Sequence, residues 1–379
     1  MDFFRGVFRQ AYLSRYTVTM SGIPVFFIGA SGHIGAAVLQ ALHAAHPELP
    51  IRALVRQQED VDHLDSLYQG SVTSALGTLE DVGIVAEEAA RAQLVINCAP
   101  DFALPLPTLL PSLSSNPHPQ TFLLQTSGAA RIWPPPSGLN PHPKIWSDLT
   151  DLSSLPTDTT HAAQDITIST YPGINAAIIS PTFVIGKSPS VRHKHPIIFP
   201  DLMHVIRQQG QAFVVEQGKN LTTFVDTEEL AGLYVLLVGD ALRCIRGEKQ
   251  VDENIWGEKG YFFAGGWEVS MREFIVDWLL PVLEGNETSK TWLWNQEGKG
   301  VKELGLGEVV GSILGRFEGQ EAEAWSRHIA EGFGTSMRIR GDRGRRYLGW
   351  EPTGRVKLGE AVEAVVRYFE EREKSITEL

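Results

Sequence analysis

Short apolar runs recur along the first part of the chain. They are bounded by glycine, proline and polar residues, and they do not alternate apolar with polar positions. Continuous runs of this kind are typical of strands that are buried on both faces of a parallel sheet. The pattern therefore predicts strands within residues 24–28, 51–55, 92–100 and 121–133.

The first run leads into FFIGASGHIGAAVLQ, in which Gly29, Gly32 and Gly35 are three residues apart. Apolar side chains then recur at helical spacing, so the segment predicts a strand, a tight turn and a helix. In this arrangement the first glycine makes the turn, the second lets a pyrophosphate approach the backbone, and the third lets the helix pack closely. The helix start offers free N–H groups to phosphates. The predicted cofactor-binding residues here are the three glycines with Ser31, His33 and Ile34; an ordinary glycine-rich turn is the alternative.

The end of the second strand is the position that distinguishes NAD from NADP in dinucleotide folds. An acidic residue there would accept from the ribose 2′-hydroxyl of NAD, but this chain has Arg56, with Arg52 inside the strand. A guanidinium suits a 2′-phosphate through charge-assisted hydrogen bonds. Glu59 and Asp60 follow closely and weaken the argument, and the arginines could simply border the sheet. The sequence favours NADP over NAD.

Several stretches together resemble the short-chain dehydrogenase/reductase superfamily, in its extended, nucleotide-sugar epimerase/dehydratase-like branch. They include the glycine turn, AQLVINCAP at 92–100 and TFLLQTSGAARIW at 121–133. Further matches are INAAIISPTFVIGK at 174–187, TTFVDTEELAGLYVLL at 222–237 and RRYLGWEP at 345–352. The resemblance spans about residues 22–368.

The resemblance implies an α/β fold, with a doubly wound parallel Rossmann sheet and a smaller α/β C-terminal substrate lobe. It implies an NAD(P)-binding domain at 21–190, completed by 216–240, and a lobe from 191–215 and 241–372. Ser127 would hydrogen-bond the reacting oxygen. Further cofactor contacts would come from the loops after two strands, through Asn97, Ala99, Pro181 and Thr182. Homodimers are common in the resembling family, so a homodimer is one possibility, although the sequence itself does not indicate the oligomeric state.

The chain departs from this family at its catalytic pair, a tyrosine four residues before a lysine. No tyrosine here has a lysine at that spacing. In THAAQDITIS the corresponding positions are His161 and Asp165, which would share a helix face. In one account His161 donates the proton and Asp165 orients it. In the other account the pair is structural, and Tyr171 is a third possibility for the missing phenol.

The composition of the 379-residue chain excludes several classes of ligand and partner. The formal net charge of −12 argues against a nucleic-acid-binding surface. The two cysteines form no zinc motif, and the histidines at 193, 195 and 204 lack the spacing of a metal site, so we predict no metal. No apolar run is long enough to span a membrane, and a cytoplasmic protein is expected. Residues 1–20 are interpreted as an N-terminal extension, with a targeting peptide as the alternative.

One basic stretch stands out in this acidic chain. Residues 191–207 concentrate arginine, lysine and histidine, and could hold an anionic group of the substrate or form a solvated patch. The leading hypothesis for the whole chain is an oxidoreductase that acts on a carbonyl or alcohol of a small metabolite. The alternatives are an NADP(H)-binding regulator or redox sensor without catalysis and, third, a nucleotide-sugar epimerase or dehydratase.

Overall fold

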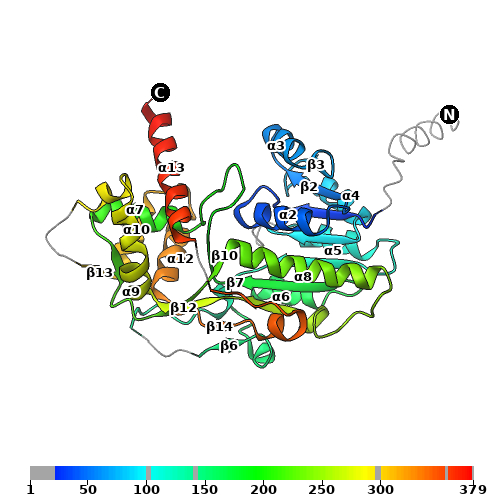
Figure 1. Ribbon diagram of the computed structural model, residues 1–379. Helices are drawn as coiled ribbons and strands as arrows, with labels where there is room; N and C mark the ends of the chain where they lie inside the picture. The colour runs from blue at the N-terminus through cyan, green and yellow to red at the C-terminus, as the bar shows by residue number, and fades with distance from the viewer. Residues whose placement is uncertain (1–21, 100–103, 140–143, 295–299, 355–356, 378–379) are drawn as a thin grey trace.

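The computed structural model describes residues 22–99, 104–139, 144–294, 300–354 and 357–377 (Figure 1). The two interpretations of residues 1–20 therefore lie outside the described residues. Within the described ranges, no helix is both long and apolar enough to cross a membrane. The cytoplasmic location and the homodimer stay predictions.

A seven-stranded parallel sheet forms the centre of the larger domain, in the order β11-β7-β5-β4-β1-β2-β3. Its strands are β1 (Val25–Ile28), β2 (Ile51–Val55), β3 (Val72–Leu76), β4 (Leu94–Asn97), β5 (Phe122–Thr126), β7 (Asn175–Pro181) and β11 (Tyr261–Ala264). The strands predicted within 24–28, 51–55, 92–100 and 121–133 are β1, β2, β4 and β5. The order reverses at β1, and in such sheets ligands bind outside the carboxyl ends of the strands at this point. The predicted doubly wound Rossmann fold is confirmed.

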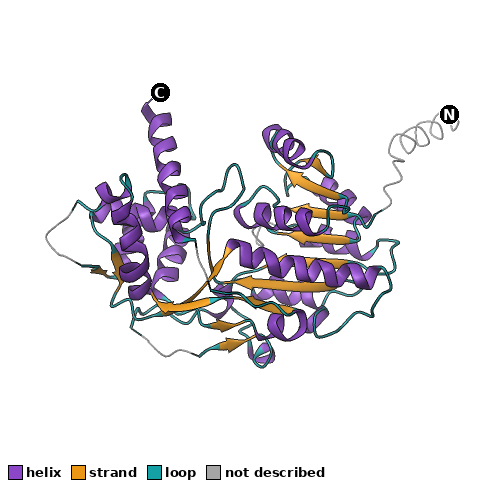
Figure 2. Cartoon of the chain, viewed as in Figure 1, coloured by secondary structure: helices purple, strands orange, loops and turns teal. Residues whose placement is uncertain are grey.

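Helices cover both faces of the sheet (Figure 2). Alternate residues of β1 are buried on opposite faces of the sheet. Val25 and Phe27 face one core cluster, while Phe26 and Ile28 face the other. The first cluster includes apolar side chains of α2 (His33–Ala45), α3 (Gln58–Tyr68) and α8 (Thr227–Ile245). The second includes those of α4 (Val82–Arg91), α5 (Leu106–Ser114) and α6 (Ala162–Ser169). Burial on both faces accounts for the continuous apolar runs.

The smaller lobe is built around short sheets and helices. Its strands are β8 (Phe183–Ile185), β10 (Leu221–Asp226) and β12 (Trp267–Ser270) in one sheet, β9 (Phe213–Val215) with β13 (Lys302–Leu304), and β6 (Trp146–Ser147) with β14 (Ile339–Arg340). Its helices are α7 (Phe199–Gln209), α9 (Met271–Glu273), α10 (Leu280–Gly285), α11 (Leu306–Leu314), α12 (Ala322–Gly334) and α13 (Leu358–Thr377). Single-turn and irregular helices complete the chain: η2 (Ala129–Ile132), η3 (Leu152–Ser154), η4 (Gly257–Lys259), η5 (Phe274–Leu279), η6 (Ser289–Trp292) and η7 (Gly344–Leu348).

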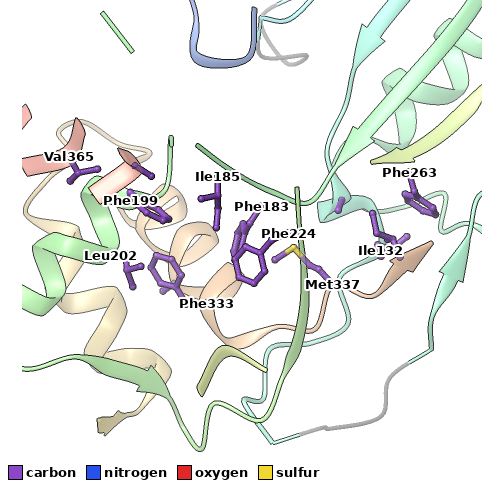
Figure 3. Packing of buried hydrophobic residues seen from close by; sticks show 14 of the residues in the cluster. Ile132, Phe183, Ile185, Phe199, Leu202, Phe224, Phe263, Phe333, Met337 and Val365 are labelled. Carbon is purple, nitrogen blue, oxygen red and sulfur yellow. The ribbon is translucent and has the colours of Figure 1, made fainter. Parts of the chain in front are cut away.

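The lobe and the large sheet share one hydrophobic core. Figure 3 shows Phe183, Phe224 and Met337 packed together, with Ile132 and Phe263 on the side of the large sheet. The rings of Phe183 and Phe224 are 5.7 Å apart. This continuity fixes the lobe against the carboxyl ends of the large sheet.

The division of the chain differs in detail from the predicted domain boundaries. Strand β11 comes from the segment 241–372 that was assigned to the lobe, yet it pairs with β7 at the edge of the large sheet. Strand β10 comes from 216–240, which was expected to complete the Rossmann domain, but it pairs with β8 and β12 in the lobe. Helix α8, which follows β10, covers the large sheet. The domains are interleaved at both places.

Asp148 joins β11 to the segment around η7. Its buried carboxylate accepts from the backbone N–H groups of Phe263 at 2.9 Å and Arg343 at 2.8 Å. Burial raises the pKa of Asp148 to about 7, although both hydrogen bonds oppose the shift. At pH values between the ordinary pKa of an aspartate and about 7, Asp148 in the folded protein therefore holds a proton that it has released in the unfolded chain.

We expect the free energy of unfolding to fall as pH rises from about 4 to about 7, by up to about 1.4 kcal/mol per pH unit from this group. The variant Asp148→Asn cannot titrate and should show a smaller slope. Urea unfolding of both proteins across this pH range measures the slopes. An equal slope in the variant would contradict the assignment.

Candidate functional site

The glycine turn between β1 and α2 has the geometry predicted for a phosphate-binding loop. Gly29 has φ +81°, and a Cβ there would lie 2.5 Å from the backbone nitrogen of Ala99. The N–H of Gly32 donates to the carbonyl of Gly29 at 3.0 Å, and a Cβ on Gly35 would lie 2.0 Å from that carbonyl oxygen. Gly32 precedes α2, whose start has no side-chain cap. The first N–H groups of α2 are thus available to an anion at the switch point of the sheet, so the turn fits a dinucleotide pyrophosphate.

His33 and Ser31 also connect the turn to distant segments. The imidazole of His33 has Nδ1 3.0 Å from the carbonyl of His193 and Nε2 3.2 Å from Oγ1 of Thr227. Burial lowers the pKa of His33 to about 4, so its ring is neutral at pH 7. Its proposed contact with phosphate stays a prediction. Ile34 packs partly buried against the core on the α8 side of the sheet.

The two arginines of β2 have different surroundings. Nε of Arg52 donates to Glu88 on α4 at 3.0 Å. Arg56 directly follows the strand and is exposed. Glu59 and Asp60, which were expected to weaken an anion site, both bind Arg192 at 2.7 and 2.8 Å. Arg56 thus lies at the end of the strand, and Arg192, a residue far away in the sequence, neutralises the two acids that follow it.

The end of β4 lies beside the glycine turn. Asn97 is buried; its Nδ2 donates to Gln125 at 3.0 Å, and its Oδ1 accepts from the N–H of Ala99 at 3.1 Å. These bonds fix the backbone that contacts Gly29. Burial raises the pKa of the Cys98 thiol to about 12, with weaker opposing effects from Thr126 and Tyr234. The Cys98 thiol is thus protonated at neutral pH, the form that is the weaker nucleophile.

Ser127 and Asp165 meet at the carboxyl end of β5. Oγ of Ser127 donates to Oδ2 of Asp165 at 3.0 Å. Nη1 of Arg131 donates to the same carboxylate oxygen at 3.1 Å. Burial raises the pKa of Asp165 to about 6, and the charge of Arg131 is the largest effect against this shift. At neutral pH the carboxylate therefore orients the hydroxyl of Ser127.

His161 lies beside the same loop. It precedes α6 with φ +70°, so it is the N-cap of the helix rather than part of its first turn. A Cβ on Gly128 would lie 2.7 Å from Nε2 of His161, which places the imidazole directly against the backbone next to Ser127. The predicted spacing thus brings His161 and Asp165 to one place, with Asp165 donating its backbone N–H to the carbonyl of His161 at 3.0 Å.

Tyr171 lies elsewhere. It is in the turn before β7, whose first residue is Asn175, and therefore at the amino end of that strand. Ser127 follows the carboxyl end of the neighbouring parallel strand. The structure thus separates Tyr171 from Ser127 by the length of the strands, and Tyr171 does not replace the missing phenol.

Arg131 and Tyr261 belong to the site but were not identified from the sequence. Arg131 is buried, binds Asp165 and the carbonyl of Pro156, and lies over the ring of Tyr261 at 5.1 Å. Burial and the charge of Asp165 raise the pKa of Tyr261. The one available signal was Arg131 itself, a single cation within the small and apolar run SGAARIW directly after Ser127.

Two buried polar atoms near this place make no hydrogen bond within the described part of the chain. They are Oδ1 of Asp165 and Oγ1 of Thr182. The first lies on α6, and the second follows the end of β7. Buried polar groups are normally hydrogen-bonded, so atoms of this kind point to a bound ligand or ordered water. Pro181 ends β7 and Thr182 follows it, as the predicted position beside the cofactor requires.

A stacked pair of aromatic rings joins this region to helix α12 of the lobe. Trp133 stacks on His328 of α12, with ring centroids 4.8 Å apart and planes inclined by 20°. Burial lowers the pKa of His328, and the charge of His161 adds to this effect. His161 and His328, one from each part of the protein, thus influence each other electrostatically.

Comparison with known proteins agrees with this architecture. The chain matches no family model. A curated relative, the oxidase ucsJ of an Acremonium species, is 23% identical over 348 residues, which cover 87% of this chain and 93% of the relative. The structure is similar to a double mutant of the dTDP-glucose 4,6-dehydratase DesIV of Streptomyces venezuelae with NAD bound, with a TM-score of 0.59, 16% identity and coverage of 92% and 97% of the two chains. It is also similar to the yeast methylglyoxal/isovaleraldehyde reductase Gre2 complexed with NADPH, with a TM-score of 0.53, 12% identity and coverage of 92% and 99%.

The predicted resemblance to the extended, epimerase/dehydratase-like branch is confirmed at the level of the fold. The similarity covers nearly the whole chain, lobe included. The three similar proteins are, by their names, an oxidase, a dehydratase and a reductase. The fold is thus one that serves several reactions, and the site decides among them.

Proposed function

We propose that this protein is an NAD(P)-dependent oxidoreductase that interconverts a carbonyl and an alcohol group of a small metabolite. The observation that carries the proposal is the meeting of Ser127, Asp165 and His161 at the carboxyl end of β5. This position adjoins β4 and the glycine turn, where the sheet order reverses. When bound, a nicotinamide cofactor would supply or accept the hydride.

Several groups of the chain are suited to hold that cofactor. The glycine turn and the start of α2 would bind the pyrophosphate through backbone N–H groups. The segment Asn97–Ala99 closes one side of the turn, and the buried Oγ1 of Thr182, next to Pro181, suits a carboxamide. The fit of these groups supports a dinucleotide at this place.

The residues around Ser127 are arranged to handle one proton. Because the hydroxyl of Ser127 donates its hydrogen bond to Asp165, the serine oxygen is left to accept a hydrogen bond from a substrate hydroxyl. The imidazole of His161 would take up a proton in oxidation and return it in reduction. Asp165 acts here on Ser127, to which it is bonded, as a positioning residue.

The choice of NADP over NAD rests on Arg56. Its place at the end of β2 suits a 2′-phosphate, and the pairing of Glu59 and Asp60 with Arg192 removes the acids that would repel one. Arg52, in contrast, is engaged with Glu88. These surroundings of Arg56 support the proposal that its guanidinium binds the 2′-phosphate.

Titration with NADPH and NADH, followed by nicotinamide fluorescence, tests both parts of the proposal. We expect NADPH to bind more tightly, and Arg56→Ala to weaken NADPH by about 10-fold or more with little change for NADH, because a hydrogen bond to a charged group contributes about 1.5–3 kcal/mol. Arg52→Ala is the matched control: it removes the same charge four residues earlier, within β2, and should leave the preference unchanged. Equal losses for both cofactors would reject the NADP assignment, and no binding of either would reject the function.

One observation favours the second function, a cofactor-binding regulator. Asp165 is held in a buried ion pair with Arg131 where the resembling enzymes have a lysine, an arrangement that a structural role also explains. A regulator would bind NADPH but turn over none of a broad panel of aldehydes, ketones and alcohols. Turnover of any of them that disappears in His161→Ala would decide for the enzyme.

A further inference from the structure

A segment of the lobe crosses the glycine turn. Residues 186–195, here called the strap, leave the end of β8 and pass between α2 and α13 before α7 begins (Figure 1). Oγ of Ser188 donates to the carbonyl of His33 at 2.7 Å, and Oγ of Ser190 donates to the carbonyl of Ser31 at 2.6 Å. With the contact between His33 and the carbonyl of His193, three side-chain hydrogen bonds fix the strap to the turn.

The strap is folded into a tight loop of its own. The N–H of Ser188 donates to the carbonyl of Lys194 at 3.0 Å, and the N–H of His193 donates to Oγ of Ser190 at 2.9 Å. Its tip carries Arg192, His193 and Lys194 in succession. On its far side, the ring of His195 contacts Tyr368 of α13 at 4.7 Å. The tip is therefore held in a defined position between the cofactor domain and the lobe.

This position corrects one expectation about the basic stretch 191–207. Its first residues were considered as a site for an anionic group of the substrate. In the structure the tip lies instead over the glycine turn and α3, where Arg192 binds Glu59 and Asp60. The strap thus belongs to the adenosine end of the cofactor groove and not to the loop of Ser127.

The tip brings basic groups to the end of β2. The side chain of Asp60 is only 7% exposed, so Arg192 compensates a buried carboxylate there. Beyond the effect of burial, the positive charges of Arg56 and Arg192 lower the pKa of His193, and the charge of Asp60 opposes them. Among the described residues, Glu59 and Asp60 pair with Arg192 and not with Arg56, so a bound phosphate would supply the opposite charge next to Arg56.

We infer that the strap completes a binding site for the 2′-phosphate of NADP(H), in which Arg56 and His193 donate to the phosphate and Arg192 is a positioning residue. This inference rests on the proposed function. It names a specificity element that lies 132 positions from Asp60 along the chain. Arg192 acts by neutralising Glu59 and Asp60 and by holding the tip in place, and His193 acts by its ring N–H.

The test uses NADPH and NADH with adenosine 2′,5′-bisphosphate and AMP, which carry or lack the 2′-phosphate without a nicotinamide. We expect Arg192→Ala to lower the affinities for NADPH and the bisphosphate by about 10-fold or more, since two acids then face the phosphate. The affinities for NADH and AMP should change by less than about 2-fold. His193→Ala should produce a smaller loss with the same selectivity.

Two further variants separate the strap from general effects. Lys194→Ala removes a charge from the same tip and should leave all four ligands unaffected. The triple variant that combines Arg192→Ala with Glu59→Gln and Asp60→Asn should regain the affinity of the wild type for NADPH. Equal losses for NADPH and NADH, or no loss for either, would overturn the inference while leaving the proposed function intact. Failure of the wild-type protein to bind any of the four ligands would instead overturn the proposed function.

Discussion

Replacing Gly35 with alanine is expected to abolish cofactor binding and to destabilise the protein. In a helix interior, alanine is normally favoured over glycine by about 1 kcal/mol. Here the added Cβ would lie 2.0 Å from the carbonyl oxygen of Gly29 and 2.8 Å from its carbonyl carbon. Both atoms belong to the backbone and cannot rotate away, so α2 must move off the turn. Overpacking of this kind costs about 1–3 kcal/mol, which exceeds the gain in helix propensity.

The effect on binding follows from the same displacement. The N–H groups at the start of α2 would no longer point to the position that Gly29 and Gly32 leave for a pyrophosphate. Thermal unfolding and an NADPH titration measure the two consequences separately. A variant that binds NADPH as well as the wild type would show that the turn does not hold the cofactor.

Gly232→Ala provides a matched control in the neighbouring helix α8. Apart from the backbone of α8 and the two adjoining residues, no described atom lies within 4 Å of a Cβ built at Gly232, so the substitution changes mainly the helix propensity. We expect a small gain in stability, of about 0.5–1 kcal/mol, and unchanged NADPH binding. Similar losses in both variants would mean that a helical glycine, rather than the contact with Gly29, is what matters.

The parts of the fold that were predictable are those that local pattern determines. Strands β1, β2, β4 and β5 are buried on both faces, and this requirement appears directly as short apolar runs. The glycine spacing likewise reflects contacts within one turn. The partners of β10 and β11 could not be predicted in this way, because the sheet that a strand joins is decided by contacts with segments far away in the sequence.

The same distinction applies to the site. The four-residue spacing correctly predicts that His161 and Asp165 lie together, but not that His161 takes a left-handed conformation before the helix. That conformation is unfavourable by about 1–2 kcal/mol for residues other than glycine, so packing rather than local preference must hold it. Arg131 and Arg192 were missed as site residues for a related reason. Their carboxylate partners lie 34 and 132 positions away, and charge alone does not indicate which acid a cation will meet.

Replacing Gly128 with alanine is expected to lower turnover by about 100-fold or more while leaving the fold and the cofactor affinity intact. Gly128 has an extended backbone, φ −155° and ψ 151°, which alanine adopts without strain. The added Cβ would lie 2.7 Å from Nε2 of His161, the far end of a side chain that can rotate. The imidazole would therefore move away from Ser127, and general acid–base catalysis by such a group contributes about 10²–10⁴-fold.

A double-mutant cycle identifies the cause of that loss. His161→Ala should lower turnover by a similar factor, and adding Gly128→Ala to it should cost little more, because no imidazole remains to be displaced. NADPH oxidation with the best carbonyl compound from a screen measures turnover, and the NADPH titration shows that binding persists. If the second substitution still lowers turnover in the absence of His161, the methyl group obstructs the substrate itself. If His161→Ala turns over normally, His161 is not the proton donor, and the proton must reach the substrate by way of Ser127 and Asp165, whose hydrogen bond of 3.0 Å would then be the next pair to vary.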